Sequence, residues 1–206
     1  MATKLSIYNG ALRALGERHT TLTEAREPRR LLDDVWDGGG LDRCLAAGQW
    51  NWAARTVQLS ASLSQPSFGY TNAFELPSDA HRVLAVASDG RMERPLTRYE
   101  FSNSVFYADL EAIYIRYVSN DPSYGGDLSI FPPHYESFVE AHFAAEIAPK
   151  LTAAADKVDR MIKRRRDALN DAQAIDAQFG PSQLPPTGSW ARARHGSGAS
   201  RGSREN

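Results

Sequence analysis

The chain has 206 residues, of which 42% are hydrophobic, with a formal net charge of −1 and one cysteine. This length allows one full domain of about 100 to 150 residues and an additional segment. The near-neutral charge argues against a protein that coats nucleic acid, because such domains are usually strongly basic. Cys44 alone cannot form an internal disulfide, and a cysteine-based zinc site would need its other ligands elsewhere.

The N-terminal stretch MATKLSIYNG has one lysine and no apolar run of about 7 to 15 residues, so it is unlike a secretory signal peptide. No stretch of the sequence approaches the roughly 18 apolar residues of a membrane span. We therefore expect a soluble protein that is made in a cytoplasm and has no membrane partner.

Two helical patterns open the chain. Leu5, Tyr8, Leu12 and Leu15 recur at steps of three and four and predict a first helix, which Thr3 can cap and Gly16 can end. A second helix follows. Thr21 and Glu24 form a potential capping box for it, although Pro28 would move its first turn later. The triplet 38–40 is all glycine, and this predicts either one kinked helix or two separate helices.

The stretch GQWNWAAR, residues 48–55, marks a change from helical spacing to strand alternation. Trp50 and Trp52 lie within it, and each can bury on the order of 150 to 250 Å². We predict that a helical layer and a sheet layer share one core at this corner. The alternating runs that follow predict strands over 56–59, 73–76, 82–87, 104–107 and 112–118, in an antiparallel sheet or a small sandwich.

Two further helices are predicted after the strands. Pro132 and Pro133 suit the first turn of one, which Pro149 should bend or end. The other spans about 156–179, with Ile162 and Phe179 on its apolar side, and stops at Gly180. The remaining residues are rich in Gly, Ser, Pro and Arg and cannot bury a core. Residues 182–206 hold four arginines and one glutamate, a charge of +3 that leaves −4 on the rest.

The pattern as a whole predicts an α+β fold. A helical bundle of about four helices is formed by residues 1–51 and 130–180, an antiparallel β domain is inserted at 52–129, and an extended tail covers 181–206.

Two groups of polar residues are candidates for a chemical site. Ser78, Asp79 and His81 are the residue types of a hydrolase triad, but they lie within four positions, so we interpret them as a turn before a strand. His142 and Glu146 lie one helical turn apart. The neighbouring positions on that face cannot bind a metal, so we interpret the pair as a histidine satisfied by a carboxylate. We predict no catalytic residue, no cofactor and no metal.

Basic residues form the strongest candidates for partner binding. The run Lys163, Arg164, Arg165 and Arg166 covers a full helical turn, so one of them, Arg165, should point toward the apolar side and pair or extend to solvent. A solvated face, a protein interface and a nucleic-acid contact remain open for this run. The tail has residue types that are common at protein interfaces, and we predict that they bind a partner; the alternative is a tail that is simply a disordered end. These residues are Trp190, Arg192, Arg194, Arg201 and Arg204.

Several stretches occur in an order that resembles the head-to-tail adaptor family of short-tailed bacteriophages, also called tail tubular protein A. They are IYNGALRALGE, GQWNWAAR, VQLS, AFELPSDAHRVLAV, EAIYIRYV and HYESFVEAHFAAEIA, within about residues 5 to 180. The glycine triplet and Pro149 depart from the uninterrupted helices of that family, and the tail past Gly180 matches no motif of it.

The resemblance implies a non-enzymatic virion protein with a helical bundle and an inserted β domain. Twelve copies would form a ring between the portal and a tail nozzle of the tubular protein B kind, and DNA would pass through without sequence-specific binding. On this hypothesis the basic tail lies on the portal, and the β domain faces the nozzle. The alternative is a basic helical DNA-binding module that uses Lys163 to Arg166, and an enzyme is the weakest option.

Overall fold

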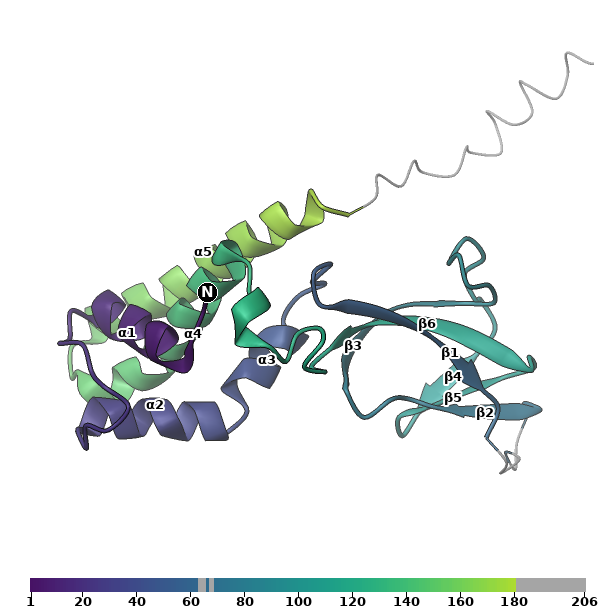
Figure 1. Cartoon of the computed structure of the whole chain (residues 1–206), viewed down its shortest axis with the longest axis horizontal. Helices are drawn as coiled ribbons and strands as arrows, with labels where there is room; N and C mark the ends of the chain where they lie inside the picture. Colours follow the sequence, from purple (N-terminus) through teal and green to yellow (C-terminus); the bar gives the residue numbers. More distant parts are fainter. Residues whose placement is uncertain (63–65, 67–68, 181–206) are drawn as a thin grey trace, which may run out of the picture.

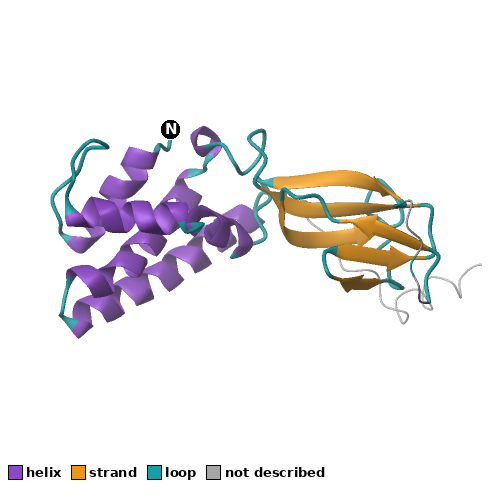
Figure 2. Cartoon of the chain, turned by 90° about the horizontal axis from the view of Figure 1, so that it is seen from below, coloured by secondary structure: helices purple, strands orange, loops and turns teal. Residues whose placement is uncertain are grey.

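The computed structural model describes residues 1–62, 66 and 69–180, so the predicted tail lies outside the described residues. Helices gather at one end of the molecule and strands at the other (Figures 1 and 2). The predicted α+β class is confirmed. No helix in this part of the chain combines the length and the apolar composition that a bilayer span requires.

Five helices form the helical part among the described residues. They are α1 (Lys4–Leu15), α2 (Glu27–Asp37), α3 (Gly40–Ala46), α4 (Pro133–Leu151) and α5 (Ala155–Ala177). Helix α4 lies at the centre and packs against the other four. The ring centroid of Phe143 on α4 lies 6.3 Å from that of Tyr8 on α1. The Tyr8 ring packs edge-on against the ring of Trp36 on α2, with the centroids 5.9 Å apart. Segments from both ends of the sequence therefore share one core.

The ends of α1 follow the predicted capping. The Thr3 side chain accepts a hydrogen bond from the Ser6 amide at 3.0 Å, and the Ser6 hydroxyl accepts one from the Thr3 amide at 2.9 Å. Gly16 ends the helix in the left-handed conformation, with φ of 70°. That conformation is strained for residues with a Cβ atom, so glycine suits this position.

The predicted capping box at Thr21 and Glu24 is wrong, because α2 begins only at Glu27. Pro28 lies in its first turn, where the missing amide hydrogen costs nothing. Glu24 instead accepts a hydrogen bond from the Thr20 hydroxyl and pairs with Arg26 at 2.8 Å.

Two residues of the glycine triplet, Gly38 and Gly39, lie between α2 and α3 and decide between the two predicted alternatives. Gly39 takes a left-handed φ of 77°, so the two helices are separate. Pro149 does not end α4, which continues to Leu151. The proline lies in the last turn, where its missing amide removes one helical hydrogen bond, and the helix ends two residues later.

The strands form two antiparallel three-stranded sheets, as the prediction of a small sandwich required. One sheet has the order β1-β6-β3, and the other has the order β2-β5-β4. The strands are β1 (Ala54–Ser60), β2 (Asn72–Glu75), β3 (Ala80–Ala87), β4 (Glu100–Ser102), β5 (Val105–Ala108) and β6 (Ala112–Ser119).

Strand β4 was not predicted from the sequence. It pairs with β5 across a turn in which Asn103 and Ser104 have φ of 54° and 62°. Positive φ at both central residues is typical of a two-residue hairpin turn that matches the twist of the strands. The signal in the sequence was Asn103, since asparagine tolerates this conformation better than most residues.

The prediction that helices and sheet share one core at the two tryptophans is wrong for most of the sheet. The strands have a separate core around Phe74, Phe106 and Ile115. Trp50 is fully buried in the helical core, and its indole N–H donates to the Cys44 carbonyl at 3.1 Å. This hydrogen bond holds the indole against the helices. Of the described strand residues, Val118 on β6 and Leu84 on β3 join the helical core.

Candidate interaction surfaces

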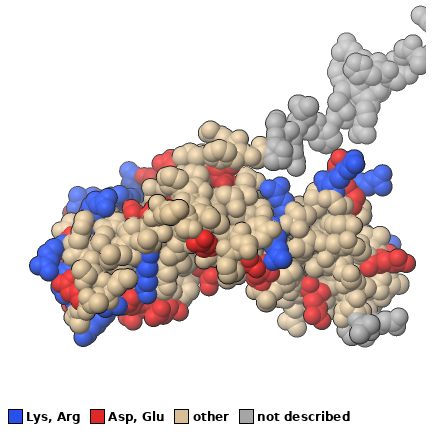
Figure 3. All heavy atoms as spheres, viewed as in Figure 1, with Lys and Arg blue, Asp and Glu red and all other residues tan. Residues whose placement is uncertain are grey.

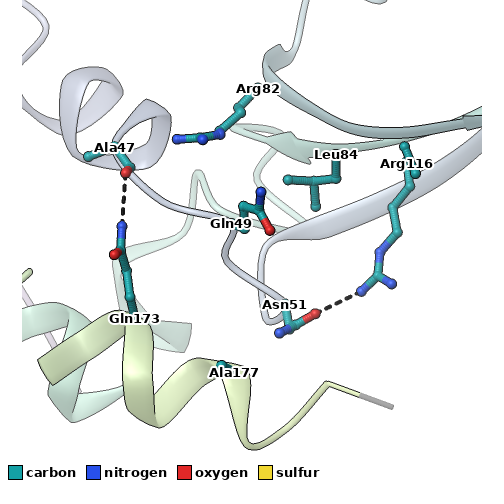
Figure 4. Close-up of a pocket in the computed structure, with 9 residues that line it drawn as sticks. Ala47, Gln49, Asn51, Arg82, Leu84, Arg116, Gln173 and Ala177 are labelled. Carbon is teal, nitrogen blue, oxygen red and sulfur yellow. Dashed lines mark hydrogen bonds between the residues drawn. The ribbon is translucent and has the colours of Figure 1, made fainter. Parts of the chain in front are cut away.

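A chain of hydrogen bonds joins the helical part to the sheet. Asp176, near the end of α5, is only 3% exposed, and its Oδ2 accepts from the Asn51 amide at 2.7 Å and from the Asn51 Nδ2 at 3.0 Å. The Oδ1 of Asn51 accepts from Arg116 on β6 at 3.0 Å (Figure 4). We call Asn51, Arg116 and Asp176 the junction bracket. It fixes α5, the turn before β1 and the central strand β6 to one another.

A cleft of about 650 Å³ lies beside the junction bracket and presents two arginines. Arg82 donates to the Ala46 carbonyl at 3.1 Å, and Gln173 donates to the Ala47 carbonyl at 3.1 Å. In Figure 4, Gln49 and Leu84 lie between Arg82 and Arg116. Neither arginine has an ion-pair partner among the described residues, so both guanidinium groups can bind an anionic group. Figure 3 shows basic atoms at this boundary between the two parts.

The three triad-type residues do not assemble into a triad. Asp79 accepts hydrogen bonds from Arg55 at 2.9 Å, from the Tyr117 hydroxyl at 3.1 Å and from the Ser119 hydroxyl at 2.5 Å. His81 instead lies 3.3 Å from a carboxylate oxygen of Asp42. The amide of Ala80 donates to the Pro77 carbonyl at 3.1 Å, which confirms the predicted turn before a strand.

The Asp79 cluster also changes the acidity of that carboxyl group. Burial, the largest single influence, opposes ionisation, but the hydrogen bonds from Ser119, Arg55 and Tyr117 together outweigh it and lower the pKa of Asp79 below its usual value. The same cluster raises the pKa of Tyr117 to about 12, chiefly through burial and then through the charge of Asp79. Asp79 therefore joins β1, β6 and the turn before β3 as an ionised hydrogen-bond acceptor.

The predicted pairing of His142 with Glu146 is wrong. Nε2 of His142 is buried and has no hydrogen-bond partner among residues 1–62, 66 and 69–180, whereas Glu146 pairs with Arg165 at 3.0 Å. Burial lowers the pKa of His142 to about 4, so its ring is neutral at pH 7. Within residues 1–62, 66 and 69–180, no three His, Cys, Asp or Glu side chains form a potential metal-binding group.

The basic run lies on α5, and its members differ in their surroundings. Arg165 is partly buried and forms the ion pair with Glu146, so of the two predicted outcomes, pairing or extension into solvent, the structure shows pairing. Lys163, Arg164 and Arg166 are exposed. Their role in partner binding stays a prediction. The other predicted contact residues lie in the tail, outside the described residues, namely Trp190, Arg192, Arg194, Arg201 and Arg204.

A second cleft was not predicted from the sequence. We call it the terminal groove, a space of about 420 Å³ where α4 begins and α5 ends, lined mainly by Trp52, Pro132, Pro133, His134 and Phe179. Phe179 was predicted on the apolar, packed side of its helix, but it is 74% exposed. Helical spacing could not reveal this, because α5 ends at Ala177 and the phenylalanine follows it.

The junction bracket predicts the effect of removing the Asn51 side chain. Asn51→Ala leaves the Asp176 carboxylate and the Arg116 guanidinium each without one partner, so we expect the free energy of unfolding to fall by about 2 kcal/mol. Chemical denaturation at pH 7 measures this. Asn170→Ala, at an exposed position of α5, is the matched control and should change the stability by less than about 0.5 kcal/mol. Equal effects of the two variants would contradict the role of the bracket.

The Asp79 cluster predicts a pH dependence. Because its pKa is lowered by folding, Asp79 adds stability above the ordinary aspartate pKa of about 3.9, and this stability is lost as the pH falls through the folded-state value. We expect Asp79→Asn to cost about 2 kcal/mol at pH 7 and progressively less below about pH 4.

Denaturation curves of the wild type and the variant between pH 2 and 7 give the comparison. Asp34→Asn, at an exposed position of α2, is the matched control because Asp34 has no ion pair in the described chain. A cost of Asp79→Asn that does not change across this pH range would count against the proposed ionised state.

Comparisons with known proteins give no family for this chain. No protein-family model matches the sequence, and no curated protein matches it. The function is therefore proposed from the sequence pattern and from the geometry described above.

Proposed function

We propose that this chain is a structural connector of the head-to-tail adaptor type. Copies of it would form a ring, of twelve by the resemblance, that joins a portal to a tail nozzle in the virion while DNA passes through the channel. The observation that carries the proposal is the insertion of the strands between the two halves of the helical part, with the junction bracket holding both parts in one orientation. The order of the matching sequence stretches adds to it.

The fixed junction is what a ring of identical copies requires. A head-to-tail interface closes only when the rotation between neighbours divides a full turn, so every copy must hold the same shape. The junction bracket ties α5 to β6 through the side chain of Asn51, with Asp176 buried. A hinge at this position would spread the rotation over many angles and favour open assemblies.

The basic residues suit contacts with a symmetric partner. Lys163, Arg164 and Arg166 extend from α5 into solvent, and the tail adds Trp190 and its arginines. Each contact is individually weak when it is exposed and screened by salt. In a ring the later contacts become intramolecular, so many weak contacts sum to a strong attachment.

The second candidate is a DNA-binding module, and the exposure of Lys163, Arg164 and Arg166 is the observation that favours it. Such binding would use phosphate contacts and would be independent of sequence. It is the weaker candidate because α5 also contains five acidic residues, which lower the positive potential of the helix; they are Asp156, Asp159, Asp167, Asp171 and Asp176.

The connector proposal predicts a partner-dependent change of mass. The purified chain should behave as a monomer of 22.7 kDa, and twelve copies should assemble when a cognate portal is added, because the portal supplies the symmetric template. Native mass spectrometry or light scattering measures both states. A chain that lacks residues 181–206 should fail to assemble if the tail holds the portal, and normal assembly of that chain would refute this role of the tail.

The basic run predicts a charge-reversal effect. The triple variant Lys163→Glu, Arg164→Glu and Arg166→Glu should lower the affinity for the portal by at least about tenfold. This corresponds to about 1.4 kcal/mol, shared over several contacts. Thermal unfolding should stay close to the wild type, because the three side chains are exposed.

The control is the double variant Arg91→Glu and Arg94→Glu, because both arginines lie on the exposed loop after β3, far along the chain from α5. This variant should assemble normally. The second candidate would be favoured instead if the monomer bound duplex DNA tightly, if this binding weakened steeply with salt, and if only the triple variant lost it.

A further inference from the structure

The terminal groove has the composition of a peptide-binding surface. Its walls come from the aromatic residues Trp52, His134 and Phe179 and from Pro132 and Pro133, which precede and begin α4. The rings of His134 and Phe179 are stacked with their centroids 6.5 Å apart. Grooves lined by aromatic side chains are the surfaces that bind extended, proline-rich segments, because such segments are already ordered before binding.

Two polar atoms at the groove lack partners within the described part of the chain. Nε1 of Trp52 and Nε2 of His134 are both shielded from solvent, and neither has a hydrogen-bond partner there. An indole nitrogen can only donate, and leaving a buried donor unpaired costs about 1 to 3 kcal/mol. A carbonyl group that entered the groove would remove this cost after a small adjustment of the rings. A segment in the polyproline conformation has free carbonyl groups to offer, since it forms no internal hydrogen bonds.

The chain itself supplies such a segment at this place. Phe179 lines the groove, and Gly180 lies next to Asn51, so close that a Cβ at Gly180 would be 3.4 Å from the Asn51 Nδ2. The sequence continues as Pro181-Ser182-Gln183-Leu184-Pro185-Pro186. At about 3.1 Å per residue, these six residues can reach roughly 19 Å. We infer that the terminal groove is the docking site of the chain's own segment 181–186.

The covalent connection of segment 181–186 to Gly180 favours this segment over the same segment of a second copy as the occupant of the groove. A segment joined directly to the edge of the groove has a high effective concentration there, whereas the same segment of a second copy must first meet it. Proline also restricts the unbound segment, so less conformational entropy is lost on docking. The inference concerns the protein by itself and does not depend on ring assembly.

The test measures contacts and exchange at Trp52 in the full-length chain by NMR. We expect nuclear Overhauser contacts between the indole of Trp52 and the rings of Pro185 or Pro186. The double variant Pro185→Ala and Pro186→Ala should lose these contacts, and its Trp52 indole N–H should exchange about tenfold faster, because a hydrogen-bonded proton exchanges only from the open state. Exchange at equal rates in both proteins would overturn the inference.

Two further variants test the groove side. Phe179→Ala removes one exposed wall and should accelerate exchange at Trp52 as the proline variant does. Ile162→Ala is the matched control, since Ile162 is a 45% exposed apolar residue in the middle of α5, and it should leave the exchange rate unchanged. Contacts that appear only between labelled and unlabelled copies, and that vanish on dilution, would assign the groove to a second copy and overturn docking of the chain's own segment.

Discussion

The arrangement of the two parts depends on one buried carboxylate. Asp176 is almost fully buried, and the amide and the side chain of Asn51 satisfy it, while the same side chain accepts a hydrogen bond from Arg116 on the central strand. A buried charge without such partners is strongly unfavourable, so the three residues must keep their positions together. Because they belong to α5, to the turn after Trp50 and to β6, their mutual positions set the orientation of the sheet on the helices.

The end of α5 concentrates the features that bear on function. The last two residues of α5 contribute Asp176 to the junction bracket and Ala177 to the cleft lined by Arg82 and Arg116, and Phe179, just after the helix, lines the terminal groove. The chain then leaves the described structure at the edge of that groove. A connector that must hold its copies in one geometry and send a basic tail toward a partner would benefit from this arrangement, since one helix end fixes the body and also sets the starting point of the tail.

Much of the fold was predictable because local patterns and packing agree in this chain. Thr3 and Gly16 bound α1 as expected, and five of the six strands were predicted from alternation. The failures occurred where two local signals competed. Thr21 does not cap α2, because Pro28 is favoured in the first turn of a helix and the helix begins later, at Glu27. Glu24 instead pairs with Arg18 and Arg26 and accepts a hydrogen bond from Thr20. The short strand β4 was missed because it has only three residues, all of them exposed.

By itself, the sequence determined most of the element types and the interruption at the glycines, since propensity and periodicity act over a few neighbouring residues. Only the tertiary structure decided the partners. It joined Asn51 to Asp176, left His142 without the neighbouring carboxylate, gathered Asp79 with Ser119 rather than with His81, and opened a groove between Trp52 and Phe179. These contacts join residues as many as 125 positions apart, and their geometry follows from how the helices and sheets pack, which local spacing does not encode.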